Sequence, residues 1–170
     1  MGYVHDTQMS QWIAFSQCAY SAGTLTPTLA SNVASNNRTA ADANFNIFIP
    51  VRLPSNGAAY KGAYLKSIDV YYSVATAALD DLATVELEKI VMAAATGSAP
   101  TGSAPAISLD AGHDTAAERK ATGEHKMTVT LTTPVWVDDD DHYVLYMACD
   151  AAATSVFKLY GARANYTFRI

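Results

Sequence analysis

The chain has 170 residues, of which 50% are hydrophobic and only 16% are charged, and its net charge is −5. This length suits one domain, and the apolar content is enough for a core without a metal ion or disulfide bonds. The basic residues are scattered rather than clustered, which argues against a nucleic-acid-binding surface. A small domain with so little charge has a rather apolar surface, which favours an assembly with neighbouring subunits.

The sequence predicts neither export by an ordinary signal nor insertion in a membrane. Residues 1–11 are polar and lack the basic and apolar regions of a signal peptide. No apolar run approaches the ~20 residues of a transmembrane helix. The two cysteines, Cys18 and Cys149, lie in apolar alternating contexts, and we expect buried free thiols rather than a disulfide.

Residues 1–42 differ in composition from the rest of the chain. They are rich in Ser, Thr, Asn and Ala, and their large apolar side chains, such as Trp12, Phe15 and Tyr20, are sparse. Pro27 in an alternating segment suits an edge strand or an extended arm. We therefore expect an N-terminal arm or peripheral strands over 1–42, wrapping the body or a neighbour's body, and a separate domain over 43–170.

The first half of that domain reads as a series of strands. Apolar residues alternate with others over 45–51, and Pro50, Pro54 and Gly57 then indicate a turn. Residues 65–74 form the next strand, with Ile68, Val70, Tyr72 and Val74 on one face. Residues 82–91 alternate as a strand does, although their Glu, Leu and Lys content also suits a helix.

The second half continues the pattern. We expect a short strand over 107–110, helical turns over 114–120 with Thr115 and Glu118 at capping-box spacing, and a strong strand over 126–132 that Pro134 breaks. The closing strands are 142–149, 155–160 and 162–170, with a turn at Gly161. About eight amphipathic strands without long helices predict an all-β antiparallel sandwich or jelly roll with an extended N-terminal arm.

The acidic run Asp138, Asp139, Asp140 and Asp141 is the strongest polar signal in the sequence. Such oxygen-rich clusters can bind Ca²⁺, but calcium loops space their carboxylates and usually include a glycine. A hydrated hairpin turn that separates two apolar strands explains the run more simply. We accordingly predict no metal and no cofactor, and keep these four aspartates as candidate ligands.

Catalytic motifs are not recognisable in this sequence. There is no Gly-x-Ser-x-Gly elbow and no phosphate-binding glycine loop. Glu86 and Glu88 share a strand face and could serve a glycosidase, but a hydrated polar face accounts for them. Asp110, His113 and Asp114 could offer a histidine and two carboxylates to a divalent metal, but His113 precedes a predicted helical turn that Asp114 or Thr115 would cap, which already explains those residues. His125 is expected at the surface. We therefore predict that the protein is not an enzyme.

Aromatic residues are the best candidates for contact with a partner or a ligand. The chain has ten tyrosines. Tyr71 and Tyr72 are adjacent in one strand and must point to opposite faces, so one of them leaves the core. Exposed tyrosines on a sheet can stack on sugars or anchor a protein interface, while ordinary cross-strand packing is the simpler alternative. The interface or ligand candidates are Trp12, Phe15, Tyr20, Tyr71 and Tyr146.

Three stretches carry a family resemblance, namely residues 48–54 (FIPVRLP), 65–72 (LKSIDVYY) and 160–167 (YGARANYT). Together they resemble β-sandwich virion surface proteins of tailed phages and related metagenomic sequences, including head decoration or cement proteins. The resemblance covers about residues 45–170 and rests on structural motifs. It implies a jelly-roll-like sandwich in a virion, made without a signal peptide, and it supplies no catalytic residues.

The function expected first is therefore that of a non-enzymatic capsid decoration protein. It would bind a capsid or another virion protein as a homo-oligomer, with a trimer favoured, and its arm would reach a neighbour. The alternative is a carbohydrate- or receptor-binding β-sandwich that uses exposed tyrosines. A bacterial surface or filament-forming protein is a further alternative.

Overall fold

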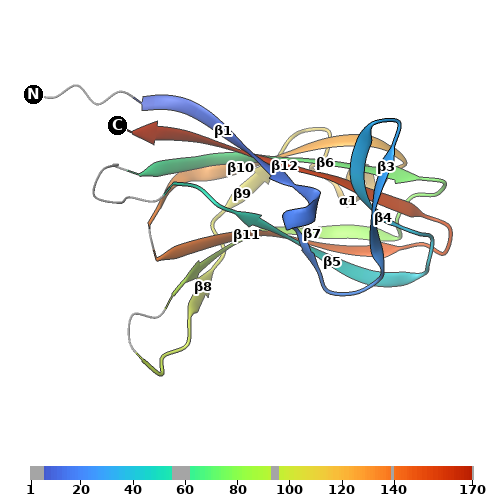
Figure 1. Cartoon of the computed structure of the whole chain (residues 1–170), viewed down its shortest axis with the longest axis horizontal. Coiled ribbons are helices and arrows are strands. Elements are labelled where there is room, and N and C mark those ends of the chain that lie inside the picture. The colour runs from blue at the N-terminus through green and yellow to red at the C-terminus, as the bar shows by residue number, and fades with distance from the viewer. Residues whose placement is uncertain (1–5, 55–61, 93–95, 139, 170) are drawn as a thin grey trace, which may run out of the picture.

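The computed structural model describes residues 6–54, 62–92, 96–138 and 140–169. The predicted turn at Gly57 and Asp139 of the acidic run lie outside the described residues. Two antiparallel sheets pack face to face, which confirms the predicted β-sandwich (Figure 1). The described residues include two helical elements, a 3-10 turn η1 (Phe15–Gln17) and a short helix α1 (Ala116–Arg119).

The larger sheet has seven strands, and β12 (Val156–Arg169) and β6 (Ala63–Ala75) lie side by side at its centre. Beyond β6 come β10 (Gly123–Val137) and β9 (Ile107–Leu109). On the other side of β12, its C-terminal half pairs with β1 (Asp6–Ala14) and its N-terminal half pairs with β4 (Val33–Arg38), which β3 (Leu25–Ala30) extends. The first and last described strands are therefore neighbours, and β1 begins where β12 ends (Figure 1).

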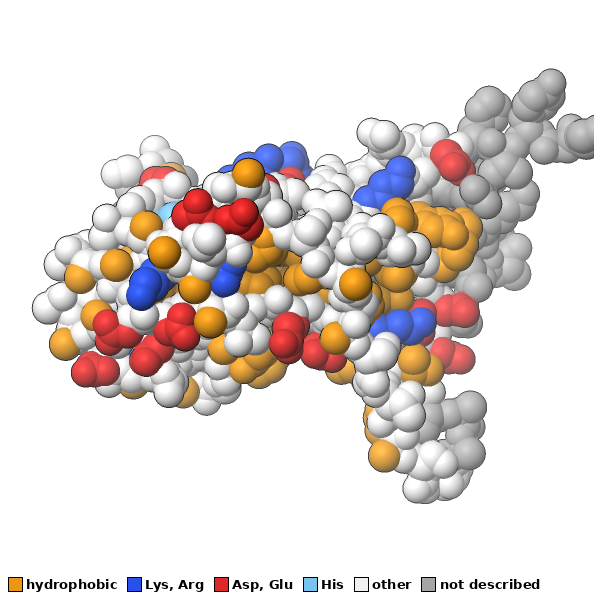
Figure 2. Space-filling view, turned by 180° about the vertical axis from the view of Figure 1, so that it is seen from behind, with side chains coloured by type: hydrophobic (Ala, Val, Ile, Leu, Met, Phe, Trp, Pro, Cys, Tyr) orange, Lys and Arg blue, Asp and Glu red, His pale blue; other side chains and the backbone are white. Residues whose placement is uncertain are grey.

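The smaller sheet has five strands in the order β2 (Ala19–Tyr20), β5 (Ala43–Val51), β11 (Asp141–Ala151), β7 (Asp81–Val91) and β8 (Thr101–Ser103). The hairpin of β7 and β8 projects from the body of the sandwich (Figure 1). Seen from behind, the molecule carries acidic and hydrophobic side chains interspersed over this body, with the same hairpin standing away from it (Figure 2).

The core lies between the sheets and follows the period-2 pattern of the strands. Ile68, Val70, Tyr72 and Val74 of β6 are buried, as their alternation predicts. Residues 82–91 form a strand rather than a helix. Leu82 and Leu87 are buried in this core, and Glu86 between them is exposed. Thr115 and Glu118 form the predicted capping box at α1.

Two predicted chain breaks are wrong. Pro134 does not end its strand, because β10 continues to Val137 through an irregularity between Thr130 and Val135. Gly161 does not form a turn, because β12 runs through it with a bulge between Leu159 and Gly161. Gly161 has a φ of 135°, a backbone conformation that side chains disfavour, so the glycine accommodates an irregularity within a continuous strand.

Residues 6–42 lie on the body of this same chain. β1 and the β3–β4 hairpin pair with β12, while β2 pairs with β5. Ile13 and Arg38 of this segment are buried. Because its strands are paired within the chain, the segment from residue 6 onward matches the alternative of peripheral strands on the body rather than that of a free arm.

Candidate functional site

The outer face of the larger sheet presents four cross-strand rows of side chains on β1, β12, β6 and β10. The residues in register are Ala14, Gly161, Tyr71 and Lys126 in the first row; Trp12, Arg163, Asp69 and Thr128 in the second; Ser10, Asn165, Ser67 and Thr130 in the third; and Gln8, Thr167, Tyr64 and Trp136 in the fourth. Apart from Trp12, the two middle rows are polar, and the other aromatic side chains lie in the first and fourth rows.

Trp12 and Tyr71 form the aromatic pair at one end of this face. Their ring centroids lie 5.5 Å apart, and Trp12 is 51% exposed. The two strands that carry them flank β12, and Gly161 lies between them without a side chain. A Cβ atom on Gly161 would come within 2.8 Å of Cζ2 of Trp12. The glycine thus allows the indole to lie across β12 and reach Tyr71, with much of its surface open to solvent.

Asp69 organises the second row. Its carboxylate accepts hydrogen bonds from Nη2 of Arg163 at 2.7 Å, from Oγ1 of Thr128 at 2.8 Å and from Nδ2 of Asn165 at 3.1 Å. Burial raises the pKa of Asp69, but these hydrogen bonds outweigh that effect and hold its pKa below the ordinary value. The ionised carboxylate therefore fixes three side chains that come from two neighbouring strands.

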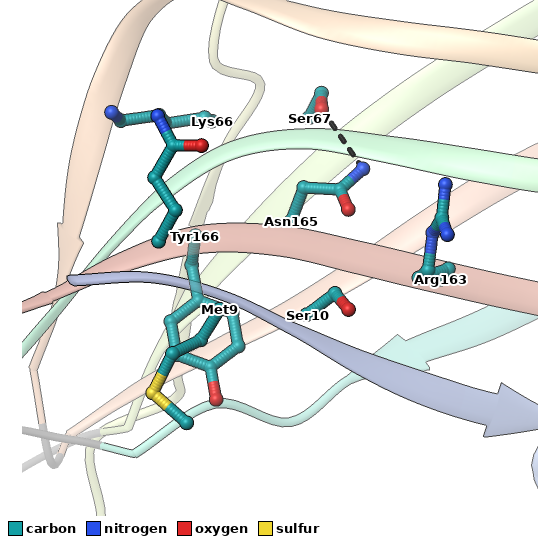
Figure 3. A pocket seen from close by; sticks show the side chains of 8 residues that line it. Met9, Ser10, Lys66, Ser67, Arg163, Asn165 and Tyr166 are labelled. Carbon is teal, nitrogen blue, oxygen red and sulfur yellow. Dashed lines mark hydrogen bonds between the residues drawn. The ribbon is translucent and has the colours of Figure 1, made fainter.

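A hollow of about 460 Å³ opens beside this cluster, lined by Gln8, Met9, Ser10, Lys66, Ser67, Arg163, Asn165 and Tyr166. Ser67, Asn165 and Arg163 lie on one side of β12, whereas Met9 and Tyr166 point to the other side (Figure 3). Nδ2 of Asn165 donates to Oγ of Ser67 at 3.2 Å, as the dashed line in Figure 3 marks. We call this hollow, with its polar lining, the groove.

Lys66 owes its position in the groove to a β-bulge. Ser67 pairs with Asn165 and Leu65 pairs with Tyr166, so Lys66 is the extra residue between these pairs. Bulges redirect side chains, and here Lys66 and Ser67 both line the groove although they are consecutive. Lys66 also lines a second hollow of about 200 Å³, shared with Asp6, Tyr64, Pro134, Trp136 and Thr167.

The second aromatic pair, Tyr64 and Trp136, borders that second hollow. Their ring centroids are 3.8 Å apart, and both side chains are half-buried. The second row contains Trp12 and the fourth row contains Gln8, which are four residues apart on β1. At ~3.3 Å per residue, these two rows are separated by roughly 13 Å along the strand. The polar groove therefore lies between two aromatic pairs, over a length greater than that of a single sugar ring.

The structure separates the five aromatic candidates. It brings Trp12 and Tyr71 together on the outer face of the larger sheet. Tyr146 lies on the smaller sheet, with its ring 5.4 Å from that of Phe48. Tyr20 is half-buried and accepts a hydrogen bond from Nδ2 of Asn36 at 2.8 Å, while Phe15 is half-buried in η1. Two of the five thus belong to one surface.

The acidic run forms part of the turn between β10 and β11. Asp141 makes an ion pair of 2.8 Å with Nζ of Lys89 and accepts a hydrogen bond from the backbone amide of Asp138. Among residues 6–54, 62–92, 96–138 and 140–169, no group of three or more histidine, cysteine or acidic side chains is placed to hold a metal ion. Asp138 and Asp140 are exposed. The described part of this run thus stabilises the turn.

The histidine near α1 belongs to a hydrogen-bonded cluster. Nδ1 of His113 is 2.8 Å from Oδ1 of Asp110, and Nε2 of His113 is 3.2 Å from Nδ1 of His125. His125 is half-buried and stacks on Tyr72 with ring centroids 4.6 Å apart, so this ring takes part in the packing of the cluster. This cluster ties β9, β10 and β6 together at the end of the sandwich.

The candidates expected from the sequence did not include Lys66, Arg163, Asn165, Tyr64 and Trp136. Their strand parity was readable, but their convergence depends on β1 and β6 flanking β12. Lys66 was also hard to predict because strict alternation places it on the same face as Ile68, whereas the bulge turns it to the outer face. Trp136 lies in the segment that follows the wrongly predicted break at Pro134.

No protein-family model and no curated protein matches the sequence. Among solved structures, the chain is similar to TmCBM61 in complex with beta-1,4-galactotriose, with 12% identity and a TM-score of 0.46 over 93% of this chain and 92% of that chain. It is also similar to the family 11 carbohydrate-binding module of the cellulosomal cellulase Lic26A-Cel5E of Clostridium thermocellum, with 8% identity and a TM-score of 0.36 over 96% and 88% of the two chains. A complex of the family 11 carbohydrate-binding module from Clostridium thermocellum with a beta-1,3-1,4-mixed-linked tetrasaccharide gives 9% identity and a TM-score of 0.35 over 96% and 89% of the two chains.

In the part of the chain that the structure describes, no helix is long and apolar enough to cross a membrane.

Proposed function

We propose that this protein is a non-catalytic carbohydrate-binding β-sandwich, and that the outer face of its larger sheet binds an oligosaccharide. The observation that carries the proposal is the groove itself, a polar hollow between the Trp12–Tyr71 pair and the Tyr64–Trp136 pair. Sugars combine apolar C–H faces with rings of hydroxyl groups, so a site for them needs both kinds of surface.

The aromatic residues supply the apolar part. Trp12 is half-exposed yet held over Gly161 and against Tyr71. Such a ring offers a large contact area and loses little conformational entropy on binding, because it is already fixed.

The middle rows supply the hydrogen bonds. Asn165 and Arg163 are fixed by Asp69, and Ser67 is fixed by Asn165. Amide, hydroxyl and guanidinium groups of this kind can donate to or accept from sugar hydroxyls without rearranging. Bound water in the groove would be displaced by ligand groups that make equivalent hydrogen bonds.

A glycan-panel screen followed by calorimetry tests the proposal. The wild type should bind at least one oligosaccharide, and Trp12→Ala should weaken it tenfold or more, since an aromatic anchor of an interface contributes about 2 kcal/mol or more. Tyr146→Ala is the matched control, because Tyr146 is a half-buried surface aromatic on the other sheet. A blank panel, or a loss caused by Tyr146→Ala and not by Trp12→Ala, would contradict the proposal.

A protein-binding function is the second candidate, in line with the capsid decoration expected from the sequence. It is favoured by the β3–β4 hairpin, where Leu29 is 74% exposed and Val33 is 52% exposed on either side of the turn. Exposed apolar side chains at a projecting tip suit contact with another protein. Co-sedimentation of the wild type and of a Leu29→Ser, Val33→Ser variant with candidate particles tests it, and equal binding by both would count against it.

A further inference from the structure

We infer that the groove selects a glycan that bears carboxylate groups, such as a polyuronate, over a neutral one. This inference rests on the proposed function and adds the chemical class of the ligand. It follows from the charges that face the groove, which oppose the charge of the whole protein.

The face around the groove is locally basic in an acidic protein. The chain has a net charge of −5, yet Arg163 and Lys126 both pair with one acidic side chain, Asp69, and Lys66 lines the groove with Arg163. The next carboxylates lie toward the ends of the face, where Asp6 borders the second hollow and Glu124 accepts a hydrogen bond from Tyr160. The three cationic side chains on this face therefore outnumber its one central carboxylate, that of Asp69.

Lys66 supplies the least compensated of these charges. It is exposed, and it makes no ion pair within the described residues. The bulge on β6 places it on the lining of both hollows. A flexible ammonium between two hollows can meet a carboxylate on either of two successive sugar units.

Arg163 supplies a fixed charge. Its Nε and Nη2 donate to Asp69 at 3.2 Å and 2.7 Å, while Nη1 makes no hydrogen bond in the described part of the chain. Its side chain remains 41% exposed. Asp69 therefore holds the guanidinium plane in place and leaves Nη1 available to a ligand. A pre-oriented guanidinium recognises planar carboxylates well, and no side chain has to be ordered on binding.

The test compares two polymers of the same sugar, polygalacturonate and its fully methyl-esterified form, by affinity electrophoresis and calorimetry at low salt. Dextran sulfate is a third ligand that carries charge as sulfate on a different backbone. We expect polygalacturonate to bind at least tenfold more tightly than the neutral ester, and this preference to shrink as salt is added. Lys66→Met should reduce the preference for the acid form about fivefold or more.

Lys158→Met is the matched control. Lys158 lies on β12 like Arg163, but five residues away, roughly 16 Å along the strand, next to the β3–β4 hairpin. This variant should keep the full preference.

Each outcome bears on a different statement. Equal binding of the acid and ester forms, with both lost in Trp12→Ala, would overturn the inference and leave carbohydrate binding in place. Equal binding of dextran sulfate that is insensitive to Trp12→Ala would also overturn it, because charge alone would then suffice. If neither the polymers nor the glycan panel bound, the proposed function would fail together with the inference.

Discussion

The indole of Trp12 lies where a side chain on Gly161 would have to be. A Cβ atom at Gly161 would meet Cζ2 of Trp12 at 2.8 Å and the carbonyl oxygen of Ile13 at 2.5 Å. The glycine therefore determines both the path of β12 and the position of the aromatic residue on which the proposed site depends.

Gly161→Ala should destabilise the protein by about 1–3 kcal/mol, the usual cost of a residue held in disfavoured backbone, with the clash against β1 in addition. It should also shift the fluorescence of Trp12 as the indole is displaced. Thermal unfolding and emission spectra measure the two effects. Gly97→Ala is the control, since Gly97 also has a positive φ, 86°, but a Cβ there meets nothing within 4 Å. An equal loss of stability in both variants would show that the contact with Trp12 is unimportant.

Asp69 should make stability depend on acid pH. Its folded pKa is lowered from the ordinary value of 3.8, because its hydrogen bonds outweigh the opposing effect of burial. A carboxyl with a depressed folded pKa stabilises the fold above its unfolded pKa, and this stabilisation is lost as the pH falls through the folded value. Denaturant unfolding between pH 6 and pH 2 should therefore show a steeper fall in the free energy of unfolding for the wild type than for Asp69→Asn. Identical slopes would contradict the expectation.

The same aspartate should also matter at neutral pH. Asp69→Ala removes the acceptor shared by Arg163, Thr128 and Asn165, and it should cost about 1–3 kcal/mol in unfolding free energy. Denaturant unfolding at pH 7 measures this loss. The groove should lose glycan affinity in parallel, because its polar side chains are no longer fixed.

Both cysteines should be unreactive in the folded protein. Cys18 and Cys149 are free thiols, and burial raises the pKa of Cys18 to about 12 and that of Cys149 further still. Because the thiolate is the reactive form, alkylation by iodoacetamide at pH 8 should be slow until denaturant is added. Mass spectrometry of the labelled protein checks this, and rapid labelling of Cys149 under native conditions would contradict its burial.

The histidine cluster should show defined tautomers. Hydrogen bonds from the amide of Thr128 and from His113 outweigh the effect of burial and lower the pKa of Asp110, so its carboxylate accepts from Nδ1 of His113. The carbonyl oxygen of Ala121 lies 2.9 Å from Nε2 of His125 and can only accept, so that nitrogen carries a proton.

In these neutral tautomers, Nε2 of His113 and Nδ1 of His125 are both unprotonated and face each other at 3.2 Å. The ¹⁵N shifts of the two rings should therefore show the Nδ1–H tautomer for His113 and the Nε2–H tautomer for His125. Finding the Nε2–H tautomer of His113 at high pH would contradict this arrangement.

The sequence was informative where burial is periodic and uninformative where pairing is distant. Ile68 and Val70, or Met127 and Val129, alternate because each strand has one face on the core, and those faces were predicted correctly. The parity rule also placed Tyr71 outside when Tyr72 is inside.

Which strands pair with each other in a sheet cannot be predicted from a local pattern of this kind. The sequence of residues 6–14 does not indicate that β12 is the strand they pair with. Trp12 and Tyr71 could therefore be named as candidates, but their contact could not be predicted. Gly161 and Pro134 were misread for a related reason, since a bulge and a turn use the same residues. Only the three-dimensional pairing distinguishes them.

The pairing of the first and last described strands also has a mechanical consequence. β1 and β12 are antiparallel, with Asp6 opposite Arg169, so tension applied between the start of β1 and the end of β12 would separate them one pair at a time, as a zipper opens. Because this separation breaks only a few interstrand hydrogen bonds at a time, it needs little force. A polymer bound across both strands, between Trp12 and Asn165, would resist the separation of β1 from β12. The force needed to unfold the protein by pulling would then be higher when the groove is occupied than when it is empty.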